Sequence, residues 1–164
     1  MASSHSKRVT KIVINALEKC GARAIIATGW GGLDADHLPD TIFKVNNVPH
    51  DWLFPKVSAV VHHGGAGTTA VGLRAGCPTL ICPIFGDQPL WGKVVYELGA
   101  GVAPIPQKKL NVENLHHAIN NLLTSPSIKQ KALELADKIK NEDGIAAAIS
   151  VIEAEMNFKK TKNG

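Results

Sequence analysis

The sequence contains few aromatic side chains and no long apolar segment. Aromatic residues make up 5% of its 164 residues, although hydrophobic residues make up 45%. Aliphatic side chains must therefore fill the core, and this composition predicts a packed globular chain instead of a disordered one. No apolar run approaches the roughly 18 residues of a membrane-spanning helix. The first ten residues also have no apolar stretch, so we expect no secretory signal in this chain.

Neither charge nor cysteine dominates the composition. The 18 basic and 14 acidic residues leave a net charge of +4, and they are dispersed, so we expect no nucleic-acid partner. Three cysteines without C-x-x-C spacing predict reduced, buried thiols and therefore a cytoplasmic protein. Cys77 and Cys82 stand at the two ends of one predicted strand, about 16 Å apart at roughly 3.3 Å per residue, which is too far for a disulfide.

Short apolar runs that alternate with helical patterns predict an α/β fold. The predicted strands are residues 22–28, 41–45, 57–62, 79–82 and 101–105, and the predicted helices are residues 7–20, 68–75 and 88–98 with three more after residue 110. Continuously apolar strands are typical of a parallel sheet that helices cover on both faces. We therefore expect a Rossmann-like domain over residues 1–158 and a basic, disordered tail over residues 159–164.

A glycine-rich segment, HHGGAGTT at residues 62–69, joins a predicted strand to a predicted helix. Small residues let a ligand approach the backbone, and a helix N-terminus offers unpaired N–H groups and the positive end of its dipole. Two threonine hydroxyls and a histidine N–H add donors, so the segment predicts a diphosphate site. A tight turn without a ligand is the alternative. The residues assigned to this site are His63, Gly65, Ala66, Gly67, Thr68 and Thr69.

A second polar pair, Asp87 and Gln88, follows the next predicted strand and opens a helix. An aspartate at this position often serves as an N-cap, which stabilises a helix by about 1 kcal/mol. A carboxylate also accepts hydrogen bonds from two neighbouring hydroxyls, and an amide both donates and accepts them. Because ligands of parallel sheets bind outside the carboxyl ends of the strands, the pair predicts a sugar site, with which capping is compatible.

Two classes of ligand remain open at this point. In a dinucleotide-binding oxidoreductase, an acidic residue about 20 positions after the glycine loop binds the adenosine ribose, and Asp87 stands at that distance from Gly67. That acid should directly follow a strand, whereas a Pro-Ile-Phe-Gly loop precedes Asp87. A nucleotide sugar accounts for both motifs, so we prefer it to NAD. The spacing of His62, His63 and Asp87 matches no standard metal-ligand pattern, and we expect no metal site.

Several longer strings resemble family 1 glycosyltransferases of the GT-B fold. These strings are GWGGL, VPHDWLFPKVSAVVHHGGAGTTAVGLRAGCPT, PIFGDQPLWG and VAPIP. The pieces PHDWLFP, GDQPLWG and APIP are most similar to the sterol 3-beta-glucosyltransferase branch. The resemblance covers residues 7–123 and extends loosely over the last helices. It implies that the chain is the C-terminal, nucleotide-sugar-binding half of a GT-B enzyme.

The resemblance also implies chemistry and site residues. It implies UDP-glucose as the donor and inverting transfer of glucose to the hydroxyl of a sterol or similar hydrophobic acceptor. It assigns the diphosphate to His63 and residues 65–69, and the glucose hydroxyls to Asp87 and Gln88. The expected uracil and ribose region comprises Trp30, Val48 and His50. No metal or other cofactor is expected, and we expect the protein to contact membranes peripherally.

Two departures from the family accompany this resemblance. Plant relatives have a ribose-binding glutamate in the helix after the glycine turn, where this chain has Val71. The acceptor-binding N-terminal half, which carries the catalytic base, and the first strand of the C-terminal half are missing from this chain. We therefore expect no catalytic residue here, no glucosyl transfer by the chain alone, and self-association through the surface of the missing strand. The alternative is a non-catalytic nucleotide-sugar-binding module or a subunit that needs an acceptor-binding partner.

Overall fold

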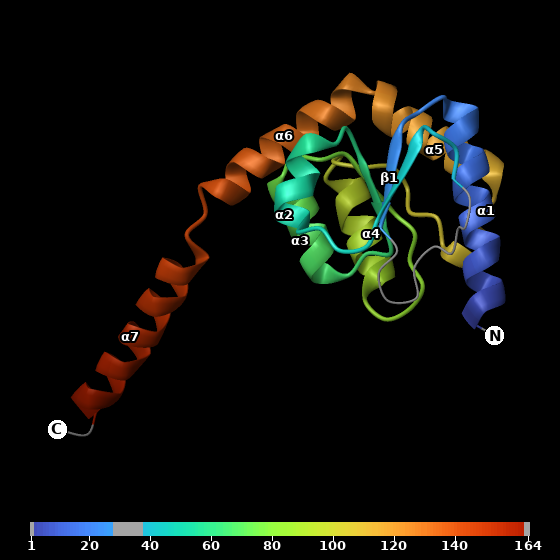
Figure 1. Cartoon of the computed structure of the whole chain (residues 1–164). Coiled ribbons are helices and arrows are strands. Elements are labelled where there is room, and N and C mark those ends of the chain that lie inside the picture. The colour runs from blue at the N-terminus through green and yellow to red at the C-terminus, as the bar shows by residue number, and fades with distance from the viewer. Residues whose placement is uncertain (1, 28–37, 163–164) are drawn as a thin grey trace.

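Four short strands lie among the helices in the computed structural model of the chain, which describes residues 2–27 and 38–162 (Figure 1). The strands are β1 (Ala24–Ala27), β2 (Ile42–Val45), β3 (Val60–His62) and β4 (Thr79–Ile81). The helices are α1 (Ala2–Cys20), α2 (His50–Leu53), α3 (Ala66–Arg74), α4 (Gln88–Glu97), α5 (Val112–Thr124), α6 (Pro126–Lys140) and α7 (Gly144–Lys162), with 3-10 turns at Phe54–Lys56 and Gln107–Lys109. The alternation of strands and helices confirms the predicted α/β class.

The strands form two parallel pairs, β1 with β2 and β3 with β4. Among the described residues β1 and β3 do not pair, so the expected continuous sheet is divided in two. In the doubly wound order 3-2-1-4-5-6, the strand before the first helix joins the two halves of the sheet. The described chain ahead of β1 is instead helical from Ala2, five residues earlier than predicted.

The predicted strand at residues 101–105 is wrong. A single parallel bridge pairs Gly101 with Thr79. The N–H groups of Val102 and Ile105 donate to carbonyl oxygens of β4 at 3.3 and 3.1 Å. Pro104 lies between them and has no N–H to donate, so the ladder is interrupted and no regular strand forms.

Helices cover both faces of the β3–β4 pair. On one face, Leu80 belongs to a core that also contains Ala16 of α1, Ile26 of β1 and Leu115 of α5. On the other face, Ile81 packs in a second cluster with residues of α3, α4 and α6, namely Leu73, Val95 and Ala132. Leu80 and Ile81 are consecutive, and alternation along a strand sends them to opposite faces. The predicted two-sided covering is confirmed for this part of the sheet.

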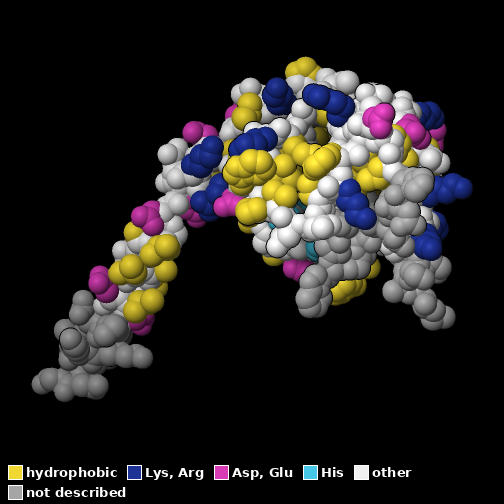
Figure 2. Space-filling model, viewed as in Figure 1, with side chains coloured by type: hydrophobic (Ala, Val, Ile, Leu, Met, Phe, Trp, Pro, Cys, Tyr) yellow, Lys and Arg dark blue, Asp and Glu magenta, His cyan; other side chains and the backbone are white. Residues whose placement is uncertain are grey.

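The helix α7 extends away from the other elements (Figure 1). Figure 2 shows hydrophobic side chains along it, and Ile145, Ile149 and Ile152 are 76%, 49% and 58% exposed. The boundary expected at residue 158 falls within this helix, and a separate disordered tail stays a prediction. Among the described residues, none of the helices combines the length and apolar character of a membrane span.

The three cysteines are free thiols, as predicted. Cys77 and Cys82 are buried, and burial raises the pKa of Cys77 to about 11 and that of Cys82 to about 12. Both thiols are therefore protonated and unreactive at neutral pH. Cys20 is half-buried, with its Sγ 3.2 Å from Nδ1 of His116.

Candidate functional site

The turn between β3 and α3 brings a histidine ring to the start of a helix. The helix begins at Ala66, two residues earlier than predicted, and Gly65 is its N-cap with no capping hydrogen bond from a described side chain. A side-chain carbon at Gly65 would lie 2.9 Å from Nε2 of His63. His63 itself is exposed. The His63 ring therefore stands beside an uncapped helix N-terminus, where a ligand can reach both.

The first three N–H groups of α3 point out of the helix. They belong to Ala66, Gly67 and Thr68, because the first intrahelical hydrogen bond runs from the N–H of Thr69 to the carbonyl oxygen of Gly65 at 2.9 Å. Such groups bind anions. A side-chain carbon at Gly67 would meet no described atom within 4 Å, so open space lies over this part of the turn.

The two threonines of the turn occupy different environments. Thr69 is 1% exposed, and its hydroxyl donates to the carbonyl oxygen of Gly65 at 3.0 Å. It braces the turn from the inside. Thr68 is half-buried at the helix start and exposes part of its side chain. A direct contact between the Thr69 hydroxyl and a ligand stays a prediction.

Gln88 organises the loop after β4. The residue is 6% exposed, and its Oε1 accepts hydrogen bonds from the backbone N–H groups of Ile84 and Phe85 at 2.7 and 3.2 Å. The side-chain oxygen is thus engaged within the protein, and the amide NH₂ is the part of Gln88 that remains to donate to a ligand.

Asp87 stands at the N-cap position of α4, but its side chain does not cap the helix in the described structure. The capping interpretation of this residue is therefore wrong. Its Oδ2 instead accepts a hydrogen bond from Nε1–H of Trp91 at 2.8 Å. Asp87 is exposed, and its carboxylate keeps further lone pairs for hydroxyl groups.

The glycine turn and the Asp87–Gln88 pair meet at Gly64. A side-chain carbon at Gly64 would lie 2.6 Å from Cγ2 of Ile81 and 3.2 Å from the carbonyl oxygen of Gln88. Gly64 is buried and has a φ of 97°, so both its backbone conformation and its neighbours require glycine. Because β3 and β4 are parallel neighbours, the segments after them emerge at one edge of the sheet. The structure thus brings the two predicted motifs together.

His62 lies beneath this edge as a half-buried, neutral histidine. Its Nδ1 accepts a hydrogen bond from the N–H of Gly64 at 3.0 Å, and its buried Nε2 has no partner in the part of the chain that the structure describes. Burial, with smaller contributions from His63 and His50, lowers the pKa of His62 to about 4. No group of three or more potential metal ligands occurs within the described residues.

The predicted uracil and ribose region is described in part. Val48 is half-buried, and the exposed His50 stacks on Phe54 with ring centroids 4.8 Å apart. Val71 is half-buried and packs against the cluster of Phe54 and Val60, so it offers no polar group to a ribose. Trp30 lies outside the described residues.

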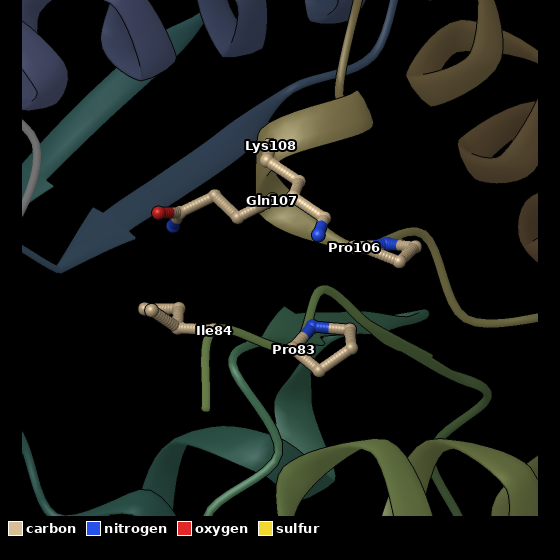
Figure 3. A pocket seen from close by; sticks show the side chains of 5 residues that line it. All are labelled: Pro83, Ile84, Pro106, Gln107 and Lys108. Carbon is tan, nitrogen blue, oxygen red and sulfur yellow. The ribbon is translucent and has the colours of Figure 1, made fainter. Parts of the chain in front are cut away.

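A hollow of about 150 Å³ adjoins the loop after β4 (Figure 3). Pro83 and Ile84 line one side, and Pro106, Gln107 and Lys108 line the other. The N–H of Gln107 donates to the carbonyl oxygen of Pro83 at 3.0 Å and ties the two sides together. No sequence pattern predicts this hollow, because its two sides are distant in the chain and its prolines belong to no binding motif.

The fold is that of the C-terminal half of GT-B glycosyltransferases. The crystal structure of the glycosyltransferase VinC in complex with DTDP matches with a TM-score of 0.71 and 25% identity, over 82% of this chain and 36% of that chain. The glycotransferase of kitacinnamycin matches in fold with a TM-score of 0.79 and 22% identity, over 90% of this chain and 38% of that chain. The chain belongs to the family described as erythromycin biosynthesis protein CIII-like, C-terminal domain, which matches residues 11–151.

Sterol glucosyltransferases are among the similar proteins. Sterol 3-beta-glucosyltransferase UGT80B1 from Arabidopsis thaliana is 50% identical over 152 residues, which cover 92% of this chain and 25% of that protein. The sterol 3-beta-glucosyltransferase of Komagataella phaffii is 41% identical over 164 residues, covering 96% of this chain and 13% of that protein. The resemblance to sterol 3-beta-glucosyltransferases is thereby confirmed. The chain spans a quarter or less of the length of these two relatives.

Proposed function

We propose that the chain is the UDP-glucose-binding half of an inverting glucosyltransferase that acts on a sterol or similar hydrophobic acceptor. The observation that carries this proposal is the junction at Gly64, where an uncapped helix N-terminus meets the Asp87–Gln88 pair. An anion site beside a free carboxylate suits a ligand in which a diphosphate is joined to a sugar. The printed names of the relatives support the sterol acceptor.

Each part of the donor has its own residues in this proposal. The N–H groups of Ala66, Gly67 and Thr68, together with the ring of His63, hold the diphosphate and stabilise the charge that develops on it as it leaves. The Asp87 carboxylate and the Gln88 NH₂ hold the glucose hydroxyls. Trp30, Val48 and His50 remain assigned to the uracil and ribose. Because the helix N-terminus supplies the electrostatic stabilisation, the proposed reaction needs no metal ion.

The chain alone binds the donor without transferring the sugar. In an inverting displacement, the acceptor attacks from the face opposite the leaving diphosphate, and the base must come within about 2.6–3.2 Å of the acceptor hydroxyl. His63 is assigned to the leaving side and cannot serve there. We therefore assign the base and the acceptor pocket to protein outside these 164 residues.

Self-association and a location follow from the same proposal. Ile25 of β1 and Val61 of β3 are 44% and 46% exposed on the strands that flank the division of the sheet. A second copy can cover these apolar positions and pair with the strand edges.

The free thiols fit the cytoplasm, and a sterol acceptor requires peripheral contact with a membrane.

Thermal unfolding with added ligands tests the proposed donor site. UDP and UDP-glucose should both raise the midpoint, NAD should not, and a ligand at 100 times its dissociation constant should add about 2.7 kcal/mol. His63→Ala should weaken both uridine ligands, whereas Asp87→Ala should weaken UDP-glucose selectively. If millimolar UDP leaves the midpoint of the folded chain unchanged, the diphosphate site is wrong, and stabilisation by NAD would favour the oxidoreductase.

An assay for steryl glucoside tests whether the chain alone transfers glucose to a sterol. The purified chain is incubated with UDP-glucose and either cholesterol or ergosterol. We expect no steryl glucoside and, at most, slow hydrolysis of UDP-glucose by water. Turnover that His63→Ala abolishes, in a preparation free of longer enzyme, would contradict the proposal that the base lies elsewhere.

A further inference from the structure

We propose that Trp91 is a positioning residue of the sugar site: its indole N–H holds the Asp87 carboxylate in the orientation that accepts hydrogen bonds from the sugar. This inference rests on the proposed function of Asp87 as the residue that binds the sugar hydroxyls. It concerns a residue outside the two sequence motifs, four positions further along α4.

The two side chains form a direct hydrogen bond on one face of α4. Nε1 of Trp91 lies 2.8 Å from Oδ2 of Asp87. Residues four apart in a helix are neighbours on its surface, so the bond needs no distortion of the helix. The main chain joins the same pair, because the N–H of Trp91 donates to the carbonyl oxygen of Asp87 at 3.2 Å. Trp91 thus contacts both the backbone and the side chain of Asp87.

The Trp91 ring is itself held in place. It is half-buried and packs against the cluster that contains Leu73, Ile81 and Val95, which belong to α3, β4 and α4. Asp87 is exposed, and an exposed aspartate without a partner samples several staggered rotamers. A ring anchored in packed side chains therefore presents a fixed donor to a carboxylate that would otherwise be free to turn.

An indole N–H suits this task chemically. It is a donor without an acceptor and carries no charge, so it orients the carboxylate and leaves its negative charge available. Only one lone pair of Oδ2 is used, and Oδ1 keeps both of its own. The carboxylate is also not consumed as a helix cap. Asp87 is thus oriented but still able to accept hydrogen bonds from a ligand.

A purely structural bond would behave differently from a positioning bond. If the bond only supported the start of α4, its loss would change the affinity for all ligands of the site by the same factor. A positioning role affects only a ligand that Asp87 touches. The comparison of UDP-glucose with UDP separates the two roles, because UDP lacks the sugar.

The first experiment measures the binding of both ligands to Trp91→Phe in the whole chain. Phenylalanine keeps an aromatic ring in the cluster but has no N–H. We expect the dissociation constant for UDP-glucose to rise about three- to tenfold, the effect of one hydrogen bond, while that for UDP stays unchanged. Tyr96→Phe is the matched control, since it removes a hydroxyl donor from an exposed aromatic residue of the same helix and should change neither constant.

A double-variant cycle completes the test. In the Asp87→Ala background, Trp91→Phe should cost no further UDP-glucose affinity, because coupled residues are non-additive. If the smaller phenylalanine ring loosens the cluster, Trp91→Gln gives a second test. Its amide can donate a hydrogen bond to Asp87 four residues earlier, whereas the side chain in Trp91→Leu cannot. The preference for UDP-glucose over UDP should therefore be larger in Trp91→Gln than in Trp91→Leu. Equal losses for UDP and UDP-glucose, or full additivity in the cycle, would overturn the positioning role.

The cycle also separates the two levels of the proposal. If Asp87→Ala weakens UDP-glucose and Trp91→Phe does not, the positioning role fails and the proposed sugar site stands. If Asp87→Ala leaves UDP-glucose binding unchanged, the sugar role of Asp87 fails, and the role of Trp91 fails with it.

Discussion

Gly64 packs against the backbone of Gln88, and a side-chain carbon at Gly64 would lie 3.2 Å from the Gln88 carbonyl oxygen. This contact connects two segments that follow different strands, and it sets the separation between the start of α3 and the loop that holds Asp87. A diphosphate and the sugar attached to it have a fixed spacing. The close approach at Gly64 therefore ties the geometry of the two half-sites together.

Gly64→Ala should destabilise the fold strongly. Its φ of 97° disfavours any residue with a side chain, and the added carbon would lie 2.6 Å from Cγ2 of Ile81. Backbone strain and overpacking together should lower the free energy of unfolding by about 2–5 kcal/mol. Urea unfolding measures the loss.

Gly86→Ala is the matched control for Gly64→Ala. Gly86 has a φ of 65°, but a side-chain carbon there would meet no described atom within 4 Å. This variant should show the backbone strain alone, about 1–2 kcal/mol. Equal losses for the two variants would contradict the importance of the contact with Ile81 and Gln88.

Gly67→Ala should separate ligand binding from stability. No described atom lies within 4 Å of the position of the added carbon, and alanine is the better helix former, so the free energy of unfolding should rise by up to about 1 kcal/mol. The methyl group would occupy the open space over the turn, where the diphosphate is proposed to lie. UDP should therefore bind more weakly to a more stable protein.

The control for Gly67→Ala is Gly144→Ala at the start of α7, where an added carbon also meets no described atom. It should leave UDP affinity unchanged. Calorimetric titration of both variants with UDP checks the prediction. Unchanged UDP affinity in Gly67→Ala would place the ligand away from this turn.

Local sequence patterns predict most of the helices, because the spacing of apolar residues depends on positions close together in the chain. They also predict that the glycine turn and the Asp87–Gln88 pair lie at the same edge of the sheet, because each follows a parallel strand. They placed the start of α3 too late, since Gly67 disfavours a helix that packing at the turn nevertheless stabilises. The side-chain oxygen Oε1 of Gln88 accepts hydrogen bonds from the N–H groups of Ile84 and Phe85, and no sequence pattern marks these bonds. The spacing of Asp87 and Trp91 on one helix was available as a signal for their contact, whereas the hollow at Pro83 and Pro106 depends on tertiary packing.

The stability of the chain should fall as the pH is lowered from about 6.5 to about 4. Burial lowers the pKa of His62 to about 4 from its ordinary value of 6.5, so within this window the unfolded chain binds a proton that the folded chain does not. Protonation of Nδ1 would also break its hydrogen bond with the N–H of Gly64. Asparagine keeps an acceptor without titrating, so His62→Asn should flatten the decline.

Urea midpoints measured at intervals between pH 7 and pH 4 check this prediction for both proteins. The other titrating groups are common to the two chains, so the difference between the curves reports His62. Curves that remain parallel across the window would show that His62 titrates alike in the folded and unfolded chains.

The chain should associate through the division in its sheet. Among the described residues β1 pairs only with β2 and β3 only with β4, so each keeps one edge without a strand partner there, and Ile25 and Val61 on these strands are 44% and 46% exposed. Unpaired edges with apolar side chains act as templates for another strand, and a lysine at such an edge opposes pairing.

Light scattering at tens of micromolar should detect dimers or larger species, and Ile25→Lys combined with Val61→Lys should shift them toward monomer. Leu123→Lys is the control, because Leu123 is 43% exposed, much like Ile25 and Val61, but belongs to the helix α5 and to neither strand. It should leave the association unchanged, since a charge weakens pairing only where the strands meet. A monodisperse monomer of the unaltered chain, or equal dissociation by Leu123→Lys, would contradict association through these edges.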